Sequence, residues 1–170
     1  MLKKYFIIFS LFPVITFAAD IDIQIQLPNF DVAEYHNPYV AVWLQTPDKK
    51  VKNLSVWYQL ESGGEKSEDG EEWLKDLRQW WRVIGRSSDM PIDGVSGATK
   101  KPGLHKLHFT QGQAPLEKLT KGDYVLMVEA TREVGGRELI KIPFSWPVKG
   151  KTELSVKGSK ELGEVRLRMN

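Results

Sequence analysis

The sequence lacks cysteine, and its formal net charge is only +2. Without cysteine there is no disulfide, no thiolate nucleophile, no zinc–thiolate site, no iron–sulfur cluster and no c-type haem attachment. The 24 basic residues nearly balance the 22 acidic ones, so a nucleic-acid partner is not expected. A chain of 170 residues, 41% of them hydrophobic, must hold its fold with a hydrophobic core, and it is long enough to do so.

Patterns for catalysis and metal binding are also scarce. The sequence contains no Gly-x-Ser-x-Gly elbow, no phosphate-binding loop and no dinucleotide-binding fingerprint. The three histidines lack the helical spacing and close acidic partners of a metal site, so we expect no metal and ordinary roles for His36, His105 and His108. A hydrolase has no nucleophile–base pair to support it.

Long hydrophobic runs are limited to one, at the N-terminus. A basic start precedes an apolar stretch over 5–17 that is too short to span a bilayer, with small side chains at Thr16 and Ala18. This pattern predicts a signal peptide over 1–18 and a single periplasmic domain over 19–170, without stable membrane insertion. The alternative interpretation of the run is a retained membrane anchor.

Along most of the remaining sequence, apolar and polar residues alternate with the period of two that is typical of β-strands. Over 21–27, isoleucine and leucine alternate with aspartate and glutamine, which is typical of a half-buried strand. The segments 40–44 and 54–60 are denser in apolar residues and predict strands buried on both faces. Further strand patterns occupy 107–109, 124–130, 139–146, 153–156 and 164–169. We therefore expect a mainly β fold, an immunoglobulin-like β-sandwich with one inserted α-helix and a long functional loop.

Two turns support that expectation. Tyr124 opens a strand two residues after Gly122, as in immunoglobulin-like sandwiches whose tyrosine hydroxyl bonds back to the preceding loop. The alternative is simply a strand that begins with tyrosine. Gly135 and Gly136 join the next two strands, where we expect glycine to supply positive φ in a hairpin.

One segment has helical periodicity instead. Between 71 and 84, apolar residues recur every three or four positions, which predicts the inserted helix. We expect Trp81 to lie in the buried stripe with Leu74, Leu77 and Ile84. That assignment leaves the adjacent Trp80 outside the stripe.

A loop without periodicity follows at 86–103, and it contains the segment DGVSGAT at 93–99. Long irregular loops in compact domains are usually functional or disordered. The pattern Asp-x-x-Ser-Gly-Ala-Thr resembles the attachment site of covalently flavinylated extracytosolic proteins. From average residue usage, its five fixed positions would match by chance in about one chain of this length in a few thousand. The alternative is a polar surface turn, because Asp-Gly and Ser-Gly are turn dipeptides.

The resemblance implies that Thr99 carries FMN as a phosphoester, transferred from FAD by a flavin transferase that requires Mg²⁺. Besides Thr99, Ser96 supplies the other hydroxyl of the segment. Gly94 and Gly97 allow turn geometry and close approach of a bulky substrate. Ala98 leaves the side of the nucleophile unobstructed.

Three further residues are candidates for holding the cofactor. Asp93 is expected either to bond to turn amides or to help bind Mg²⁺ in the transferase complex. Lys100 is positioned to offset the charge of the phosphodiester. Trp80, outside the predicted buried stripe, is the expected stacking partner of the flavin ring, because indole stacks well on isoalloxazine.

The predicted mature chain also resembles a family of bacterial periplasmic proteins of unknown function. The stretches that carry this resemblance are 39–43, 73–81, 93–99, 132–138 and 143–147. Members occur beside PepSY-type membrane proteins and flavin transferases, which implies a membrane-bound PepSY-type redox partner and a link to iron reduction or uptake. The flavinylated group shares only the attachment motif, so the fold of its FMN-binding domains is not implied.

These features together predict a periplasmic flavoprotein that acts in extracytosolic electron transfer. Because no substrate pocket is legible in the sequence, we expect an electron carrier or reductase module more than a complete enzyme. The competing interpretation is a periplasmic binding or interaction module without a redox centre. The two differ in whether the mature protein acquires covalent FMN.

Overall fold

The structure is a computed structural model that describes residues 20–60 and 70–170. The predicted signal peptide, 1–18, lies outside these ranges. The described residues form β1 (Asp20–Leu27), β2 (Tyr39–Gln45), β3 (Val51–Tyr58), η1 (Gly70–Asp76), α1 (Arg78–Val83), η2 (Gly85–Ser87), β4 (Ser96–Ala98), β5 (Gly103–Thr110), β6 (Gly122–Thr131), β7 (Arg137–Trp146), β8 (Thr152–Lys157) and β9 (Glu164–Met169).

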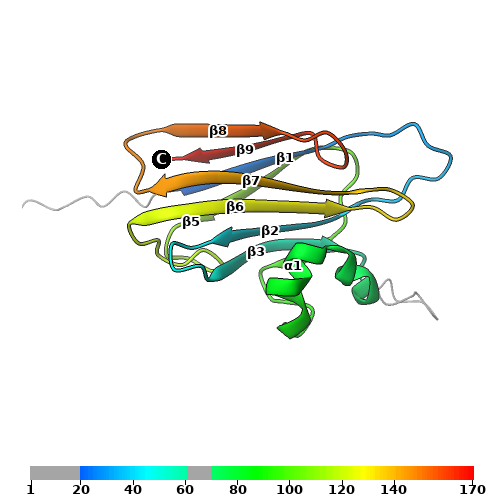
Figure 1. Ribbon diagram of the computed structural model, residues 1–170, viewed down its shortest axis with the longest axis horizontal. Helices are drawn as coiled ribbons and strands as arrows, with labels where there is room; N and C mark the ends of the chain where they lie inside the picture. The colour runs from blue at the N-terminus through cyan, green and yellow to red at the C-terminus, as the bar shows by residue number, and fades with distance from the viewer. Residues whose placement is uncertain (1–19, 61–69) are drawn as a thin grey trace, which may run out of the picture.

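The strands form two sheets that pack face to face (Figure 1). One sheet has the order β5-β1-β9-β8, and the other has the order β4-β3-β2-β6-β7. Neighbouring strands are antiparallel, except that β4 pairs in parallel with β3. The mainly β sandwich predicted from the sequence is confirmed.

The core between the sheets follows from the period of two along each strand. All four apolar side chains of β1 point inward and are fully buried, while its aspartates and glutamines are only partly buried. The five-stranded sheet contributes its inner face from β2, β6 and β7. Its residues in this core include Val40, Val42, Leu44, Leu126, Val128, Ile140 and Ile142.

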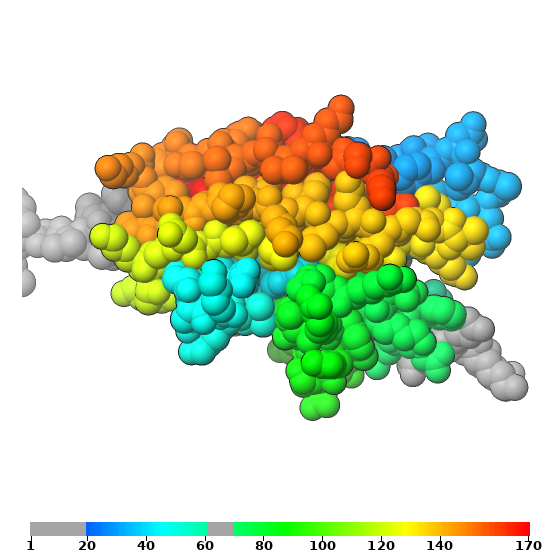
Figure 2. Space-filling view, viewed as in Figure 1, coloured from blue at the N-terminus to red at the C-terminus, as the bar shows by residue number. Residues whose placement is uncertain are grey.

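The outer face of the five-stranded sheet is covered by the helical segment η1–α1–η2, which Figures 1 and 2 show in green against the cyan strands. This second core explains why β2 and β3 are apolar on both faces, as predicted. It consists of Ala41, Trp43, Val56, Tyr58, Leu74, Leu77, Trp80, Ile84, Val95 and Met127. The molecule therefore has three layers, and the third layer carries the chain toward the 93–99 segment.

Glu129 fixes the helical segment to the sheet. This carboxylate on β6 is fully buried, and it accepts hydrogen bonds from the amides of Gln79 and Trp80 at 3.1 and 2.8 Å. Arg137 on the neighbouring strand β7 donates to the same carboxylate at 2.6 Å. A negative charge at free helical amides is stabilising, and the guanidinium balances it. The short α1 is thus capped by a strand residue.

The prediction for the two adjacent tryptophans was wrong. Trp80 is fully buried, and its indole N–H donates to Asn53 Oδ1 at 3.0 Å, whereas Trp81 is only partly buried. The segment is not one continuous α-helix, because η1 is a 3₁₀ helix in which residues three apart lie on the same face. The buried series therefore continues from Leu74 and Leu77 in steps of three. Trp80 is unavailable as a ring-stacking surface.

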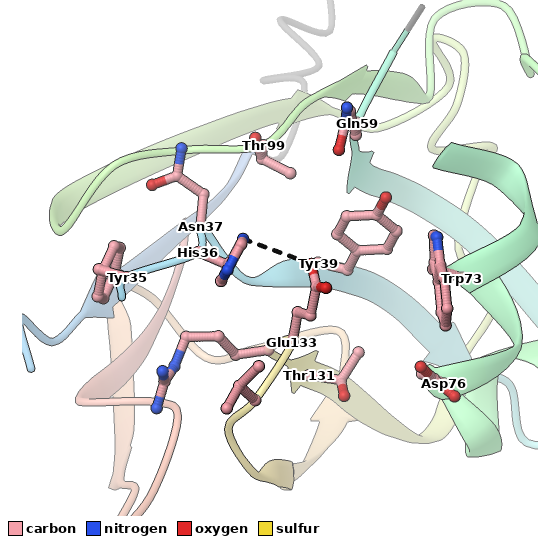
Figure 3. A pocket seen from close by; sticks show the side chains of 12 residues that line it. Tyr35, His36, Asn37, Tyr39, Gln59, Trp73, Asp76, Thr99, Thr131 and Glu133 are labelled. Atoms are coloured by element: carbon pink, nitrogen blue, oxygen red, sulfur yellow. Dashed lines mark ion pairs between the residues drawn. The ribbon is translucent and has the colours of Figure 1, made fainter. Parts of the chain in front are cut away.

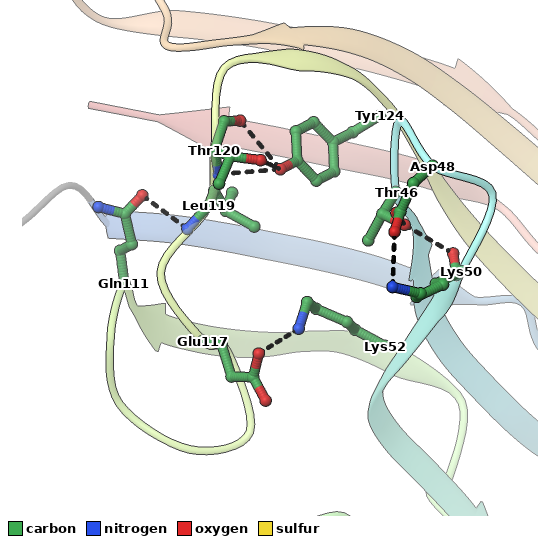
Figure 4. Close-up of polar contacts among 9 residues, drawn as sticks. All are labelled: Thr46, Asp48, Lys50, Lys52, Gln111, Glu117, Leu119, Thr120 and Tyr124. Atoms are coloured by element: carbon green, nitrogen blue, oxygen red, sulfur yellow. Dashed lines mark hydrogen bonds and ion pairs between the residues drawn. The ribbon is translucent and has the colours of Figure 1, made fainter.

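The predicted tyrosine contact at the start of β6 is confirmed. The Tyr124 hydroxyl donates to the Thr120 carbonyl at 2.9 Å and accepts from the Thr120 amide at 3.1 Å (Figure 4). The Tyr124 ring stacks on Phe144 of β7, with centroids 5.5 Å apart. One side chain therefore ties the loop before β6 to the sandwich.

Candidate functional site

The segment 93–99 runs along the edge of the five-stranded sheet. Its residues Ser96–Ala98 form β4, which pairs with β3. One more backbone bond follows β4, in which the Thr99 amide donates to the Tyr58 carbonyl at 3.1 Å. The sheet edge therefore fixes the backbone at the predicted attachment residue.

The Ser96 hydroxyl holds the turn that precedes β4. It accepts a hydrogen bond from the Ile92 amide at 2.9 Å, and the Ser96 amide donates to the Ile92 carbonyl, also at 2.9 Å. Gly94 within this turn has a φ of +67°, a conformation that glycine adopts without strain. Asp93 is exposed, and in the described structure the turn amide is bound by Ser96 and not by Asp93.

The Thr99 side chain is half-buried and lines a cavity of about 700 Å³ (Figure 3). The Thr99 hydroxyl makes no hydrogen bond to any of the described residues. The two hydroxyls of the motif therefore differ, because that of Ser96 is occupied by the turn and that of Thr99 is available. This difference favours Thr99 over Ser96 as a point of modification.

The cavity lies where several connections meet at one end of the sandwich. Its walls come from the loop between β1 and β2, the beginning of β2, the end of β3, η1 and the turn between β6 and β7. The residues around Thr99 are Tyr35, His36, Asn37, Tyr39, Gln59, Trp73, Asp76, Thr131, Arg132, Glu133 and Val134. Three of these residues are aromatic and most of the others are polar or charged, so the cavity offers both ring surface and hydrogen-bonding groups to a ligand.

Tyr39 and Trp73 lie together on one side of the cavity (Figure 3). Tyr39 begins β2 and packs edge-on against the buried Tyr58, with ring centroids 6.4 Å apart. Trp73 belongs to η1 and is 43% exposed, although the next residue, Leu74, is fully buried. The Lys75 ammonium lies 5.6 Å from the Trp73 ring centroid. Even with this contact, much of the Trp73 indole on this wall of the cavity remains exposed.

Tyr35 lies on the opposite side of the same cavity (Figure 3). Its ring stacks on Phe30 at 6.5 Å, and the Arg132 guanidinium lies 5.7 Å from its centroid. The Tyr35 hydroxyl is buried and has no hydrogen-bond partner among the described residues. Burial raises the pKa of this phenol above its ordinary value. A neutral, unpaired hydroxyl in a cavity wall is available to a polar ligand.

The turn between β6 and β7 is shaped by a buried ion pair. Arg132 Nε donates to Glu161 at 2.9 Å, and both side chains are less than a tenth exposed. A Cβ on Gly135 would lie 2.7 Å from the Arg132 guanidinium carbon, and one on Gly136 would lie 3.0 Å from Glu161 Oε1. These glycines therefore permit close approach, and the expectation that they supply positive φ was wrong. The positive φ falls on Val134, at +53°.

A second cavity, of about 690 Å³, is lined by other residues of the motif. Asp93, Gly94 and Ser96 line it, together with Tyr58 and the 90–92 segment. Gln59 borders both cavities. Residues of the 93–99 segment therefore line two hollows, and Thr99 belongs to the one with the aromatic wall.

The other predicted motif residues lie along the sheet edge beside Trp57. The Lys100 ammonium is 5.9 Å from the Trp57 ring centroid, and a Cβ on Gly97 would lie 3.6 Å from Trp57 Cδ1. Ala98 is exposed. Gly97, Ala98 and Lys100 are thus neighbours of Thr99 in the sequence, but they do not line its cavity. Trp80 lies in the helical layer.

Several cavity residues were missed by sequence reasoning. His36, expected to have an ordinary role, lies in the wall within 3.1 Å of Glu34 and 3.4 Å of Glu133. The clustering of two tyrosines around His36 was the available signal for this loop. Trp73 carried no such signal, because its exposure depends on where η1 places it.

Most of the described chain matches a known protein family. Residues 20–164 match the family described as "Predicted periplasmic protein (DUF2271)". The chain belongs to the DUF2271 family. The predicted resemblance to a periplasmic family and the predicted periplasmic localisation are thereby confirmed for this DUF2271 protein. In the parts of the chain that the structure describes, every helix falls short of what a bilayer crossing requires.

The other comparisons add little to this family assignment. No curated protein matches this DUF2271 chain. Among solved structures, the human GIVD cytosolic phospholipase A2 in complex with methyl gamma-linolenyl fluorophosphonate aligns with 89% of this chain, at 11% identity and a TM-score of 0.32. The chain spans only 17% of the length of that phospholipase chain. A TM-score this low carries no argument about fold or activity.

Proposed function

We propose that this DUF2271 protein is a periplasmic flavoprotein in which FMN is esterified to Thr99, and that it acts in extracytosolic electron transfer. One observation supports this most directly. The last residue of the flavinylation-like motif places a hydroxyl with no hydrogen-bond partner among the described residues on the wall of a cavity, while the Ser96 hydroxyl is occupied. A free hydroxyl beside open space is what a transferase needs to reach.

The cavity residues fit a flavin. Its volume of about 700 Å³ lies in the range of cofactor pockets, which is about 300–1,000 Å³. Trp73 and Tyr39 offer aromatic surface to a planar ring. The unpaired Tyr35 hydroxyl offers a hydrogen bond to a polar group of the cofactor.

The attachment step is a group transfer without electron exchange. Thr99 Oγ1 forms a bond to the phosphorus on the FMN side of FAD, the pyrophosphate P–O bond breaks, and AMP leaves. The hydroxyl proton passes to a base of the flavin transferase. Asp93, which is exposed beside the second cavity, is free to contact a Mg²⁺ ion held by that transferase.

Bound FMN would supply a centre that accepts and releases electrons. The residues of this chain would hold it: Lys100, next to Thr99 in the chain, would offset the negative charge of the phosphodiester, and the aromatic side chains of the cavity wall would contact the ring. We propose a carrier or reductase module whose electron donor is a membrane-bound PepSY-type protein. Ferric iron is the acceptor that the resemblance suggests.

Thr99→Val tests the attachment. The full chain is co-produced with a flavin transferase in the periplasm, and flavin is measured by in-gel fluorescence and by intact mass. We expect Thr99→Val to lose the flavin and keep the wild-type thermal midpoint, because the half-buried residue contributes little core packing. Thr99→Ser should retain some modification, since the hydroxyl remains. Flavin that persists in Thr99→Val, but disappears in Ser96→Ala, would move the site to Ser96.

A non-redox binding module is the second candidate, and the same cavity favours it. An aromatic wall facing an unpaired phenol hydroxyl would also suit a small uncharged ligand. A wild-type protein that remains colourless and unmodified beside an active flavin transferase would support this candidate and contradict the first.

A further inference from the structure

We infer that the isoalloxazine ring tethered at Thr99 rests on the wall formed by Trp73 and Tyr39, an inference that rests on the proposed attachment. Both side chains line the same cavity as Thr99, and Figure 3 shows them together on one side of it. The ring-binding surface is therefore assigned to η1 and the start of β2.

Trp73 is the aromatic residue best placed to gain from stacking. It is 43% exposed, and the buried face of the helical segment is completed by Leu74, Leu77 and Trp80 without it. The Lys75 ammonium lies 5.6 Å from the Trp73 ring centroid, but it leaves the indole 43% exposed, so aromatic surface remains for a planar ring. Tyr39 is held in place by its edge contact with Tyr58, so this wall is preformed.

The opposite wall is less suited to a second ring. The Tyr35 ring is already contacted by Phe30 and by the Arg132 guanidinium, and that guanidinium is bound to Glu161. Only the hydroxyl of Tyr35 remains unpaired in the described structure. This side therefore suits a polar edge of the cofactor, and the plane of the ring belongs to the other side.

The second cavity is also excluded as the ring site. Its aromatic lining residue is Tyr58, which is 2% exposed and presents no ring face. The residues of the motif that line it are Asp93, Gly94 and Ser96, whereas Thr99 lines the first cavity. A phosphoester at Thr99 therefore leads the cofactor into the first cavity.

The test compares Trp73→Ala with Trp81→Ala in the flavinylated full chain. Trp81 is the control because it is another tryptophan of the helical segment, more buried than Trp73, and it lines neither cavity. The measurements are flavin emission per covalently bound flavin, visible circular dichroism of the flavin, and the thermal midpoint. We expect Trp73→Ala to keep covalent flavin, to raise its emission several-fold and to weaken its dichroism, because a stacked indole quenches and orients the ring. Trp81→Ala should change none of the flavin signals.

Two results would overturn this assignment. Unchanged emission and dichroism in Trp73→Ala would show that the ring lies elsewhere, and brightening in Trp81→Ala would place it on the other face of α1. Failure of the proposed function is distinguishable, because wild-type protein would then carry no added FMN mass at all. Loss of FMN from a folded Trp73→Ala protein would instead assign Trp73 to recognition by the transferase and contradict the inference.

Discussion

The two ends of the sandwich differ in how completely their polar groups are paired. At the end shown in Figure 4, the Tyr124 hydroxyl both donates to and accepts from the Thr120 backbone. Gln111 Oε1 accepts from the Leu119 amide at 3.2 Å, and Lys52 pairs with Glu117. Side-chain hydrogen bonds and an ion pair therefore hold the loop residues at this end.

The end with the Thr99 cavity contrasts with this arrangement. There, the hydroxyls of Tyr35 and Thr99 lack partners among the described residues, and Trp73 is exposed. Val134, a β-branched residue, has a φ of +53° and is 83% exposed. Loops on a rigid scaffold are the usual location of binding sites, and unpaired polar groups are often found there. We therefore propose that one end of the fold serves stability and the other serves binding.

The largest effect expected is from truncating the residue that holds the helical layer in place. Trp80→Ala should lower the free energy of unfolding by about 3–5 kcal/mol, because Trp80 is fully buried and its N–H bonds to Asn53. Urea denaturation measures this. Trp73→Ala, at the cavity end, should cost under about 1 kcal/mol because the residue is exposed. Equal losses in the two variants would contradict the division between packing and binding tryptophans.

Much of the architecture could be predicted from the sequence, because strand alternation is a local signal. The β1 pattern, the two-sided burial of β2 and β3 and the Tyr124 contact each depended on nearby residues alone. Local pattern could not decide whether Trp80 or Trp81 is the buried tryptophan, because residues three and residues four positions apart both lie on the same face of a helix. The change from 3₁₀ to α-helix near Leu77 decided it.

The candidate site was predictable only in part, for a similar reason. The 93–99 segment is contiguous, so its pattern could be recognised, and Thr99 does line a cavity. The cavity walls come from five separate segments of the chain, and no local pattern reveals that Tyr35 or Trp73 lines the same cavity as Thr99. Likewise, the close approach at Gly135 depends on Glu161 and Arg132, whose pairing spans 29 residues.

A matched pair of tyrosine substitutions would sharpen the comparison between the ends. Tyr124→Phe should lower the free energy of unfolding by about 1–3 kcal/mol, because the Thr120 backbone groups lose their partner. Tyr35→Phe should leave it unchanged or raise it by up to about 1 kcal/mol, because the hydroxyl removed is buried and unpaired. Chemical denaturation of the unmodified protein gives both values. A loss in Tyr35→Phe as large as that in Tyr124→Phe would mean that the cavity hydroxyl is satisfied in solution.

The smallest expected effect concerns backbone strain, and each end of the sandwich has one strained residue with a side chain. Val134 in the cavity turn and Lys49 in the β2–β3 turn have φ values of +53° and +65°. Left-handed φ is unfavourable for residues with a Cβ, and most unfavourable for β-branched ones. Val134→Gly should therefore raise the free energy of unfolding by about 1 kcal/mol after the added flexibility of glycine is subtracted, and little packing is lost at an 83% exposed residue. Lys49→Gly should gain less, because lysine tolerates this region better than valine. Thermal midpoints of the two variants against wild type measure the difference, and a drop in Val134→Gly would show that its side chain contributes packing at the cavity rim.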